Sequence, residues 1–263
     1  MLRAANRLAS QATNSEKFEK VRVESDRTLS LNHNPFYNEM KTFIRSMPPK
    51  GHGRWLWKPY LVNYHLNNLE GCDGLLYIDA GCFFNFKSKI AEERFNHYLE
   101  MTMEHGSLAM QLVNNAGGTG DLFDSNYNSI DLMDFVGLPK ESRNTCQIQA
   151  TFLFVTPQEK SLNLVAEWLK LCQLDDFRFL RENLIKSKSS EFKEYRWDQS
   201  ILSALYKKNE MFSLPDESWW GNFDWELEGA NYPIWAMRHR SGSAPFRPTL
   251  KDFPDRALTR LNL

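Results

Sequence analysis

The sequence predicts an α/β protein with a mixed, mostly parallel sheet flanked by helices. The chain has 263 residues, a length that suits one large α/β domain. Short apolar runs at 75–78, 108–113 and 147–155 are typical of buried strands. Segments with apolar residues at helical spacing, at 88–105 and 157–172, lie between or after these runs. Strands that alternate with helices favour parallel pairing.

The composition excludes several classes of protein. Lys and Arg together number 32 and Asp and Glu 33, so no whole-chain field attracts nucleic acid or an anionic membrane. No apolar run approaches the roughly 20 residues that span a bilayer, and the first residues lack the apolar core of a signal peptide. We therefore expect a soluble, cytoplasmic chain with no transmembrane segment and no nucleic-acid partner. The four cysteines have no CxxC spacing, which favours reduced thiols over a zinc site.

The first sixty residues predict mainly helix. Apolar residues recur at helical spacing over 1–17, and imperfect alternation over 18–23 suggests a short first strand. A short helix is expected over 39–47. Pro59 suits the first position of a further helix, because a proline lacks an N–H that would be unsatisfied there. Lys58 would then directly precede that helix, with its charge free to face a ligand.

The rest of the chain continues the pattern. Gly106 is expected to end the helix over 88–105, and the Gly- and Asn-rich stretch at 114–129 predicts a long loop. Thr156, followed by Pro157 and then Glu159, has the pattern of a capping box that begins a helix. From about residue 210 the chain becomes aromatic-rich and irregular, and residues 234–237 predict a short strand. We expect residues 1–263 to form one domain with this segment as an extension.

A candidate ligand site follows the predicted strand at 75–78. Asp79 stands directly after this strand, and the small residues Ala80 and Gly81 come next. In open α/β sheets ligands bind beyond the carboxyl ends of the strands. A carboxylate placed there, with little bulk beside it, can approach a metal–phosphate group.

This stretch resembles the nucleotide-sugar glycosyltransferases of the GT-A type, in which an apolar strand ends in an Asp-x-Asp motif that holds a divalent metal on the donor diphosphate. The glycogenin-like branch also has a basic residue before the helix that leads into this strand. Lys58 in WLWKPY and Asp79 in YIDAG match these features, while Gly81 replaces the second Asp. The resemblance implies a GT-A (Rossmann-like) domain that uses Mn²⁺ or Mg²⁺, with Asp79 as a metal ligand. It implies donor contacts from these residues: Trp57, Lys58, Asp79, Ala80 and Gly81.

Two later segments extend the resemblance. Asp198 and Gln199 are similar to the first letters of the "DQDxLN" segment, whose Asp-Gln pair faces the donor sugar, so they become the candidate catalytic residues. The alternative is that Asp198 only caps the following helix. His239 matches the late histidine that is often a metal ligand in GT-A enzymes, and Arg238 and Arg240 would neutralise the diphosphate. The alternative for this basic cluster is a solvated surface.

The function predicted on this basis is transfer of a sugar from a nucleoside diphosphate sugar to a hydroxyl group of a glycan, lipid or protein acceptor. The Asp-Gln likeness is to retaining enzymes. The alternative is a catalytically degenerate GT-A scaffold that binds carbohydrate or nucleotide, which Gly81 favours. Trp57 has an alternative as well, namely packing beneath the following helix. A methyltransferase is disfavoured because no GxGxxG fingerprint follows a first strand.

Overall fold

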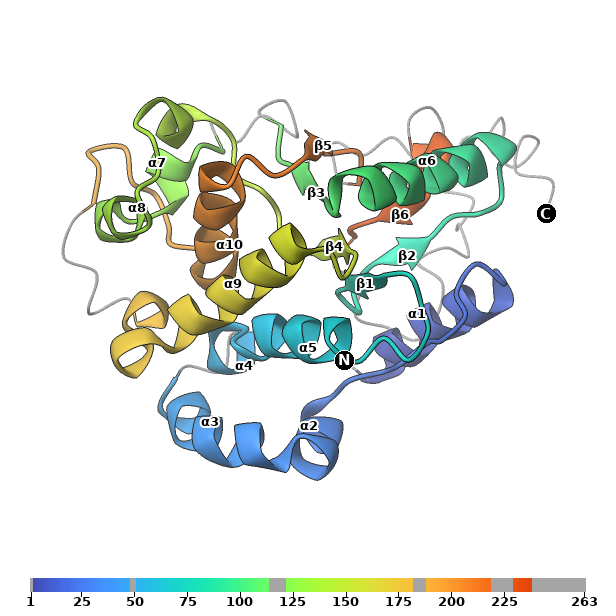
Figure 1. Ribbon diagram of the computed structural model, residues 1–263, viewed down its shortest axis with the longest axis horizontal. Coiled ribbons are helices and arrows are strands. Elements are labelled where there is room, and N and C mark those ends of the chain that lie inside the picture. The colour runs from blue at the N-terminus through green and yellow to red at the C-terminus, as the bar shows by residue number, and fades with distance from the viewer. Residues whose placement is uncertain (1, 48–50, 114–121, 182–187, 219–228, 238–263) are drawn as a thin grey trace, which may run out of the picture.

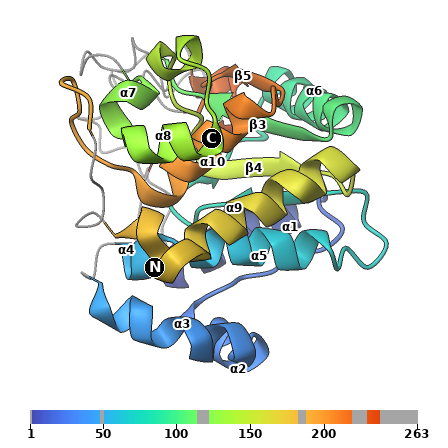
Figure 2. The same cartoon turned by 60° about the vertical axis from the view of Figure 1, so that its left-hand side comes forward.

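The computed structural model describes residues 2–47, 51–113, 122–181, 188–218 and 229–237. Its centre is a mixed sheet with helices on both faces, as Figures 1 and 2 show. Within the described residues this sheet has four strands in the order β1-β4-β3-β5. Their bounds are Leu75–Ile78 (β1), Ser107–Gln111 (β3), Phe152–Val155 (β4) and Ser213–Pro215 (β5). A separate antiparallel pair joins β2 (Phe83–Phe84) to β6 (Ile234–Trp235). The predicted α/β class is confirmed.

The prediction of mostly parallel pairing is wrong for the described sheet. β4 pairs antiparallel with both β1 and β3, and the parallel pairing joins β3 to β5. β4 is inserted between β1 and β3 and runs against both, so β1, β3 and β5 share one direction without β1 touching β3. β1 is also only half-buried rather than buried on both faces, since its described pairing is with β4 on one edge.

The strands β1, β3 and β4 alternate their side chains between two apolar layers. Leu153 and Val155 of β4 pack in the layer formed with α5 (Trp57–Leu66) and α9 (Glu159–Phe177). Phe152 and Phe154 pack on the opposite face, in the layer formed with α1 (Leu2–Asn14) and α6 (Lys89–His105). This two-residue period is what a strand covered on both faces requires.

The remaining helices surround this central unit. In Figure 1, α2 and α3 form an outer layer on the far side of α5 from the sheet, and α10 lies beside α9. Their bounds complete the helical inventory of the described chain: Asp26–Asn32 (α2), Asn34–Ser46 (α3), Gly51–Arg54 (α4), Asp124–Tyr127 (α7), Ile130–Val136 (α8) and Trp197–Lys208 (α10), with short 3₁₀ turns at Glu141–Asn144, Arg178–Leu180 and Gly229–Asn231.

The helix predicted over 88–105 begins and ends where the sequence predicts. α1 and α6 are confirmed, and Ser88 caps α6 by accepting a hydrogen bond from the Ala91 N–H. Gly106 ends α6 with φ +83°, and Gly137 ends α8 with φ +74°. Both values lie in the left-handed region that glycine adopts without strain, so these two glycines end their helices for a backbone reason.

Three other local predictions are wrong. Residues 18–23 form no strand; they are not hydrogen-bonded into either of the described sheets. α3 begins at Asn34 rather than near 39, since Pro35 fits the first turn of a helix. α9 begins at Glu159, because the Thr156 hydroxyl donates to the Gly106 carbonyl instead of capping the helix.

Candidate functional site

Lys58 lies at the centre of the candidate site. It is the second residue of α5, not the residue before it, and Pro59 occupies the third position, where its missing N–H still costs no intrahelical bond. The Lys58 side chain points into the protein and is only 5% exposed. Its ammonium lies 3.2 Å from Asp79 Oδ2, 3.6 Å from Asp198 Oδ2 and 3.1 Å from the Ala150 carbonyl oxygen.

These contacts correct one expectation about Lys58. The ammonium donates two hydrogen bonds inside the protein, to Asp79 Oδ2 and to the Ala150 carbonyl, and it also lies within ion-pair distance of Asp198 Oδ2. The two carboxylates raise the pKa of Lys58 although its burial opposes the charge. The charge of Lys58 is therefore committed to the two acidic side chains and is not free to face a ligand directly.

Lys58, Asp79 and Asp198 form one cluster, which we call the Lys58 cluster, and Asp79 is its accessible acid. The β1–β4 pairing continues one step past β1, because the Asp79 N–H donates to the Thr151 carbonyl at 2.8 Å. The Tyr77 hydroxyl donates to Asp79 Oδ1 at 2.6 Å, while Oδ2 faces Lys58. The Asp79 side chain remains 31% exposed. Its carboxylate is thus held by two donors at a strand end and still reaches solvent.

Asp198 is the buried acid of the cluster. It is the second residue of α10, whose N-cap is Arg196 without a side-chain cap hydrogen bond, so the cap interpretation of Asp198 is wrong. Its side chain is 4% exposed, and the indole N–H of Trp168 donates to its backbone carbonyl. Burial raises the pKa of Asp198 to about 7; Lys58 opposes this rise and Asp79 adds to it. A carboxyl with that pKa can exchange a proton near neutral pH.

Gln199 belongs to a buried polar network rather than standing free. Its Nε2 donates to Gln147 Oε1 at 3.0 Å, and Gln147 in turn donates to Asp124 Oδ1 at 3.0 Å. Asp124 is fully buried and also accepts from Ser203 and from Lys207. The network fixes the orientation of the Gln199 amide next to Asp198.

Aromatic rings surround the Lys58 cluster. The Lys58 ammonium lies 5.9 Å from the Trp55 ring and 5.8 Å from the Tyr77 ring, within the range of cation–π attraction. Trp57 is half-buried, with its ring 6.4 Å from that of Tyr77. Trp57 also lines a cavity of about 250 Å³ between β1, α1, α5 and residues 18–24. Trp57 therefore lies near Tyr77 and borders this cavity.

The turn after Asp79 is held by the first helix. The Cys82 N–H donates to the Asp79 carbonyl, which makes residues 79–82 a tight turn through Ala80 and Gly81. Arg7 of α1 donates to the carbonyls of Ala80 at 3.0 Å and of Cys82 at 2.8 Å. The backbone of Ala80 and Gly81 thus lies beside Asp79 in a turn that Arg7 holds in place.

Sequence reasoning missed Tyr77, Arg7 and a further buried acid, Asp216. Gln149 Nε2 donates to Asp216 Oδ1 at 3.0 Å, and burial raises the pKa of Asp216 to about 6. Asp216 directly follows β5, which the sequence did not predict, and Gln149 precedes the carbonyl that binds Lys58. Asp216 could have been found from its position directly after a strand, which is the signal that identified Asp79.

The described site can offer a metal ion one accessible carboxylate. The Lys58 ammonium lies between Asp79 and Asp198, in the place that a cation shared by both acids would take. Of the two acids, Asp79 is the one whose side chain is partly exposed. The predicted donor and metal residues Arg238, His239 and Arg240 lie outside the described residues.

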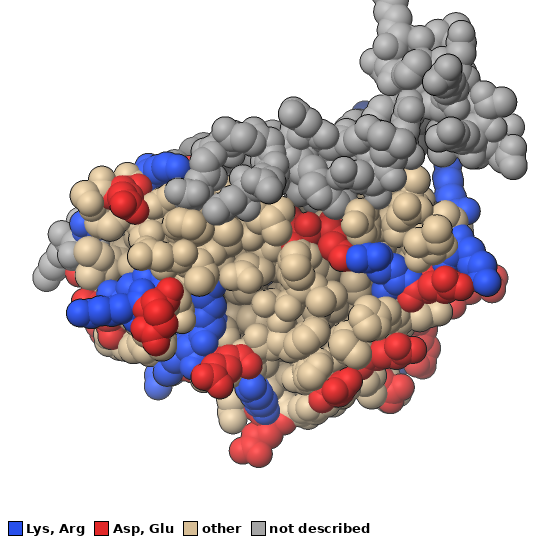
Figure 3. Space-filling view, turned by 90° about the horizontal axis from the view of Figure 1, so that it is seen from above, with Lys and Arg blue, Asp and Glu red and all other residues tan. Residues whose placement is uncertain are grey.

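Comparisons with known proteins identify no relative. No protein-family model matches the chain, and no curated protein or solved structure is significantly similar to it. Among the described residues, no helix combines the length and apolar character that crossing a bilayer needs. On the face seen in Figure 3, the described basic and acidic side chains are interspersed around a largely uncharged centre. All four cysteines are free thiols.

Proposed function

We propose that this protein is a glycosyltransferase that moves a sugar from a nucleoside diphosphate sugar to a hydroxyl acceptor. The observation that carries the proposal is the contact of one ammonium, Lys58, with both Asp79 and Asp198. These three residues come from the three described segments that resemble GT-A motifs. Segments far apart in sequence meet at the carboxyl end of β1, where ligands of α/β sheets bind.

A GT-A type of fold is part of this proposal. The mixed sheet flanked by helices is compatible with it, and β1 ends in the acid that the motif requires. Residues 1–263 would form the single transferase domain. The two residues that directly precede β4, Ala150 and Thr151, supply the carbonyl groups that position Lys58 and Asp79.

The chemistry requires charge to be stabilised on the leaving diphosphate and on an oxocarbenium-like sugar. A bound Mn²⁺ or Mg²⁺ ion would act as a Lewis acid on the phosphates, and Mg²⁺ commonly takes one or two carboxylates plus phosphate oxygens. Asp79 would hold that ion, with His239 as a second ligand. Arg238 and Arg240 would bind the diphosphate.

The roles of the remaining residues follow from their contacts. Lys58 would hold the Asp79 carboxylate in place rather than touch the sugar donor. Asp198 would accept hydrogen bonds from donor hydroxyls or hold a proton near them, given its pKa of about 7. Gln199 would lie beside the anomeric carbon, with its amide oriented by Gln147. The outcome expected from the Asp-Gln pair is retention.

A second candidate is a degenerate scaffold that binds a sugar or nucleotide without turnover. Two observations favour it. Gly81 replaces the second motif carboxylate, and Lys58 places a positive charge between the two acids, where a cation shared by both would otherwise lie. Binding and turnover must therefore be measured separately.

Calorimetric titration tests both candidates. The protein would be titrated with a panel of nucleoside diphosphates in Mn²⁺ and in EDTA, and then incubated with the corresponding nucleotide sugars while nucleotide release is followed. The transferase proposal expects metal-dependent binding of one diphosphate and slow release from its sugar derivative. Binding without release under any acceptor condition supports the degenerate scaffold. No binding to any member of the panel contradicts both.

A further inference from the structure

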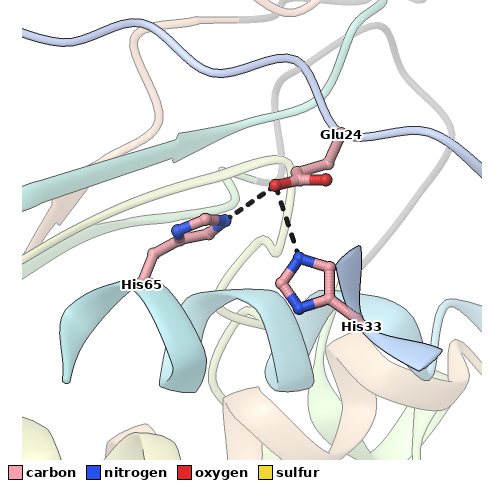
Figure 4. A group of neighbouring side chains, drawn as sticks. All are labelled: Glu24, His33 and His65. Atoms are coloured by element: carbon pink, nitrogen blue, oxygen red, sulfur yellow. Dashed lines mark hydrogen bonds and ion pairs between the residues drawn. The ribbon is translucent and has the colours of Figure 1, made fainter. Parts of the chain in front are cut away.

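A second cluster of chemically active side chains lies away from Lys58 and shares no residue with it. Glu24 precedes α2, His33 stands between α2 and α3, and His65 lies in the last turn of α5. Figure 4 shows the three side chains pointing toward one another. Glu24 Oε1 lies 3.0 Å from His65 Nε2 and 3.6 Å from His33 Nε2. Three separate segments thus meet at one carboxylate oxygen.

The spacing of these atoms fits a tetrahedral metal ion. The three ligand atoms all lie within 4.8 Å of one another. Zinc bonds of about 2.0–2.2 Å place neighbouring ligands of a tetrahedron about 3.3–3.6 Å apart. The distances from Glu24 Oε1 to the two imidazole nitrogens, 3.0 and 3.6 Å, lie close to this separation, so an ion can enter with small side-chain movements.

The surroundings of the cluster orient its ligands. His33 Nδ1 lies 3.2 Å from the Tyr60 hydroxyl, and His33 is only 3% exposed. If Nδ1 donates to that hydroxyl, Nε2 presents its lone pair toward Glu24, and metal-binding histidines are commonly held in this way. The Thr28 hydroxyl donates to Glu24 Oε2 at 2.6 Å, which leaves Oε1 facing the two imidazoles.

We propose that Glu24 Oε1, His33 Nε2 and His65 Nε2 bind one Zn²⁺ ion. Imidazole ligands favour zinc over magnesium or calcium, and two histidines with one glutamate form a known zinc ligand set that leaves a fourth position for water. The side chains of Glu24 and His65 are each 17% exposed, so the ion has a path to solvent. The ion fastens the α2–α3 layer to α5. This inference is independent of the proposed transferase activity.

The sequence gives little warning of this site. Zinc motifs are usually recognised from closely spaced cysteines and histidines, whereas these three residues lie in separate segments. α2 was not predicted at all, and without it nothing places Glu24 beside His33. The fold, rather than a motif, assembles the ligands.

The test uses the full chain without a polyhistidine tag, stripped of metal with EDTA and dialysed. Zn²⁺ binding would be measured by competition with a chromogenic chelator, and Co²⁺ would report the geometry through its absorption. We expect one tight site, a tetrahedral Co²⁺ spectrum and a higher melting temperature with Zn²⁺. His65→Gln and Glu24→Gln should each weaken binding more than about 100-fold, since loss of an outer partner alone costs about 10–100-fold.

Two further variants make the result specific. Tyr60→Phe keeps the ring that stacks on Phe36, and should weaken binding about 10–100-fold by releasing His33 Nδ1. His97→Ala removes an exposed histidine on α6 and should leave binding unchanged. Circular dichroism of each metal-free variant shows that it is folded.

Two results would overturn the proposal. One is equal Zn²⁺ affinity in the unmodified protein, His65→Gln and His97→Ala, which would place the ion on scattered surface groups. The other is a metal-free protein that binds no Zn²⁺ and melts at the same temperature with and without it. In that case the cluster is an ion pair between Glu24 and its two histidines.

Discussion

The Tyr77 hydroxyl and the Asp79 carboxylate form a 2.6 Å hydrogen bond at the end of β1. Residues two apart in a strand share one face, so the strand itself brings these side chains together. The bond fixes Oδ1 of Asp79, while Lys58 fixes Oδ2. The orientation of the accessible acid is therefore set by Tyr77 and Lys58.

Replacing Tyr77 by Phe tests how much this bond contributes to stability. A hydrogen bond to a charged group contributes about 1.5–3 kcal/mol, and we expect Tyr77→Phe to lower the free energy of unfolding by about that amount. Urea unfolding measures the change. Tyr64→Phe is the matched control, because Tyr64 is 40% exposed, and its effect should stay within about 0.5 kcal/mol. Equal effects of the two variants would mean that the Tyr77 hydroxyl does not hold Asp79.

Lys58→Met should be strongly destabilising. It leaves Asp198 buried without a cation, and removing one partner of a buried ion pair costs about 3–5 kcal/mol. Combining it with Asp198→Asn should recover part of that loss, since a neutral amide needs no counter-charge. Chemical denaturation of the single and double variants measures the coupling. Lys89→Met, at a side chain 88% exposed, serves as control. Purely additive effects in the double variant would contradict the pairing.

The raised pKa of Asp198 predicts a pH dependence of stability. With a folded-state pKa of about 7 against an ordinary aspartate pKa of 3.8, the folded protein binds a proton that the unfolded chain has lost between these pH values. Stability should therefore fall as the pH rises from about 4 to about 7. At 1.36 kcal/mol per pKa unit the effect is at most about 4 kcal/mol.

Asp198→Asn isolates this contribution. The difference in unfolding free energy between the unmodified protein and Asp198→Asn should shift in favour of the unmodified protein as the pH is lowered from 8 to 5. Comparing the two proteins removes the similar contribution of Asp216, which both contain. A difference that stays constant over this pH range would show that Asp198 titrates normally.

Asp79→Asn tests the proposed metal–diphosphate contact. The amide keeps the shape of the side chain and removes its charge, so the metal-dependent part of nucleoside diphosphate binding should be lost while the fold remains. Calorimetry in Mn²⁺ and in EDTA measures this part. Asp73→Asn is the control, since Asp73 is an exposed acid at the other end of β1. If the unmodified protein binds as tightly in EDTA as in Mn²⁺, binding relies on fixed positive charge instead.

Local signals in the sequence were enough to predict much of the fold. A run of apolar residues identified β1, and the spacing over α6 with Gly106 behind it identified a helix and its end. The pairing partners of a strand were harder to predict, because the residues of a strand do not determine which other strand lies at each of its edges. That is why the antiparallel insertion of β4 and the parallel strand β5 were missed.

Local signals in the sequence also pointed to two residues of the candidate site. Asp79 was identified from its place after a strand, and Asp198 from a motif. The burial of Lys58 could not be predicted, since it depends on Ala150 and Asp198, which only the folded chain brings near. The charge of a lysine ordinarily favours solvent, and it is buried here because two carboxylates compensate for the lost hydration.

The position of β4 between β1 and β3 bears on how the chain folds as it is made. Neither β1 nor β3 has its antiparallel partner until residue 155 has been synthesised. At about 5–20 residues per second, β1 therefore waits several seconds with its apolar residues uncovered. These contacts are far apart in sequence, which slows folding and leaves time for association with other chains. A nascent chain that ends before residue 150 contains Lys58 and Asp79 but lacks the Ala150 and Thr151 carbonyls that accept their hydrogen bonds, so this part of the protein depends on sequence synthesised much later.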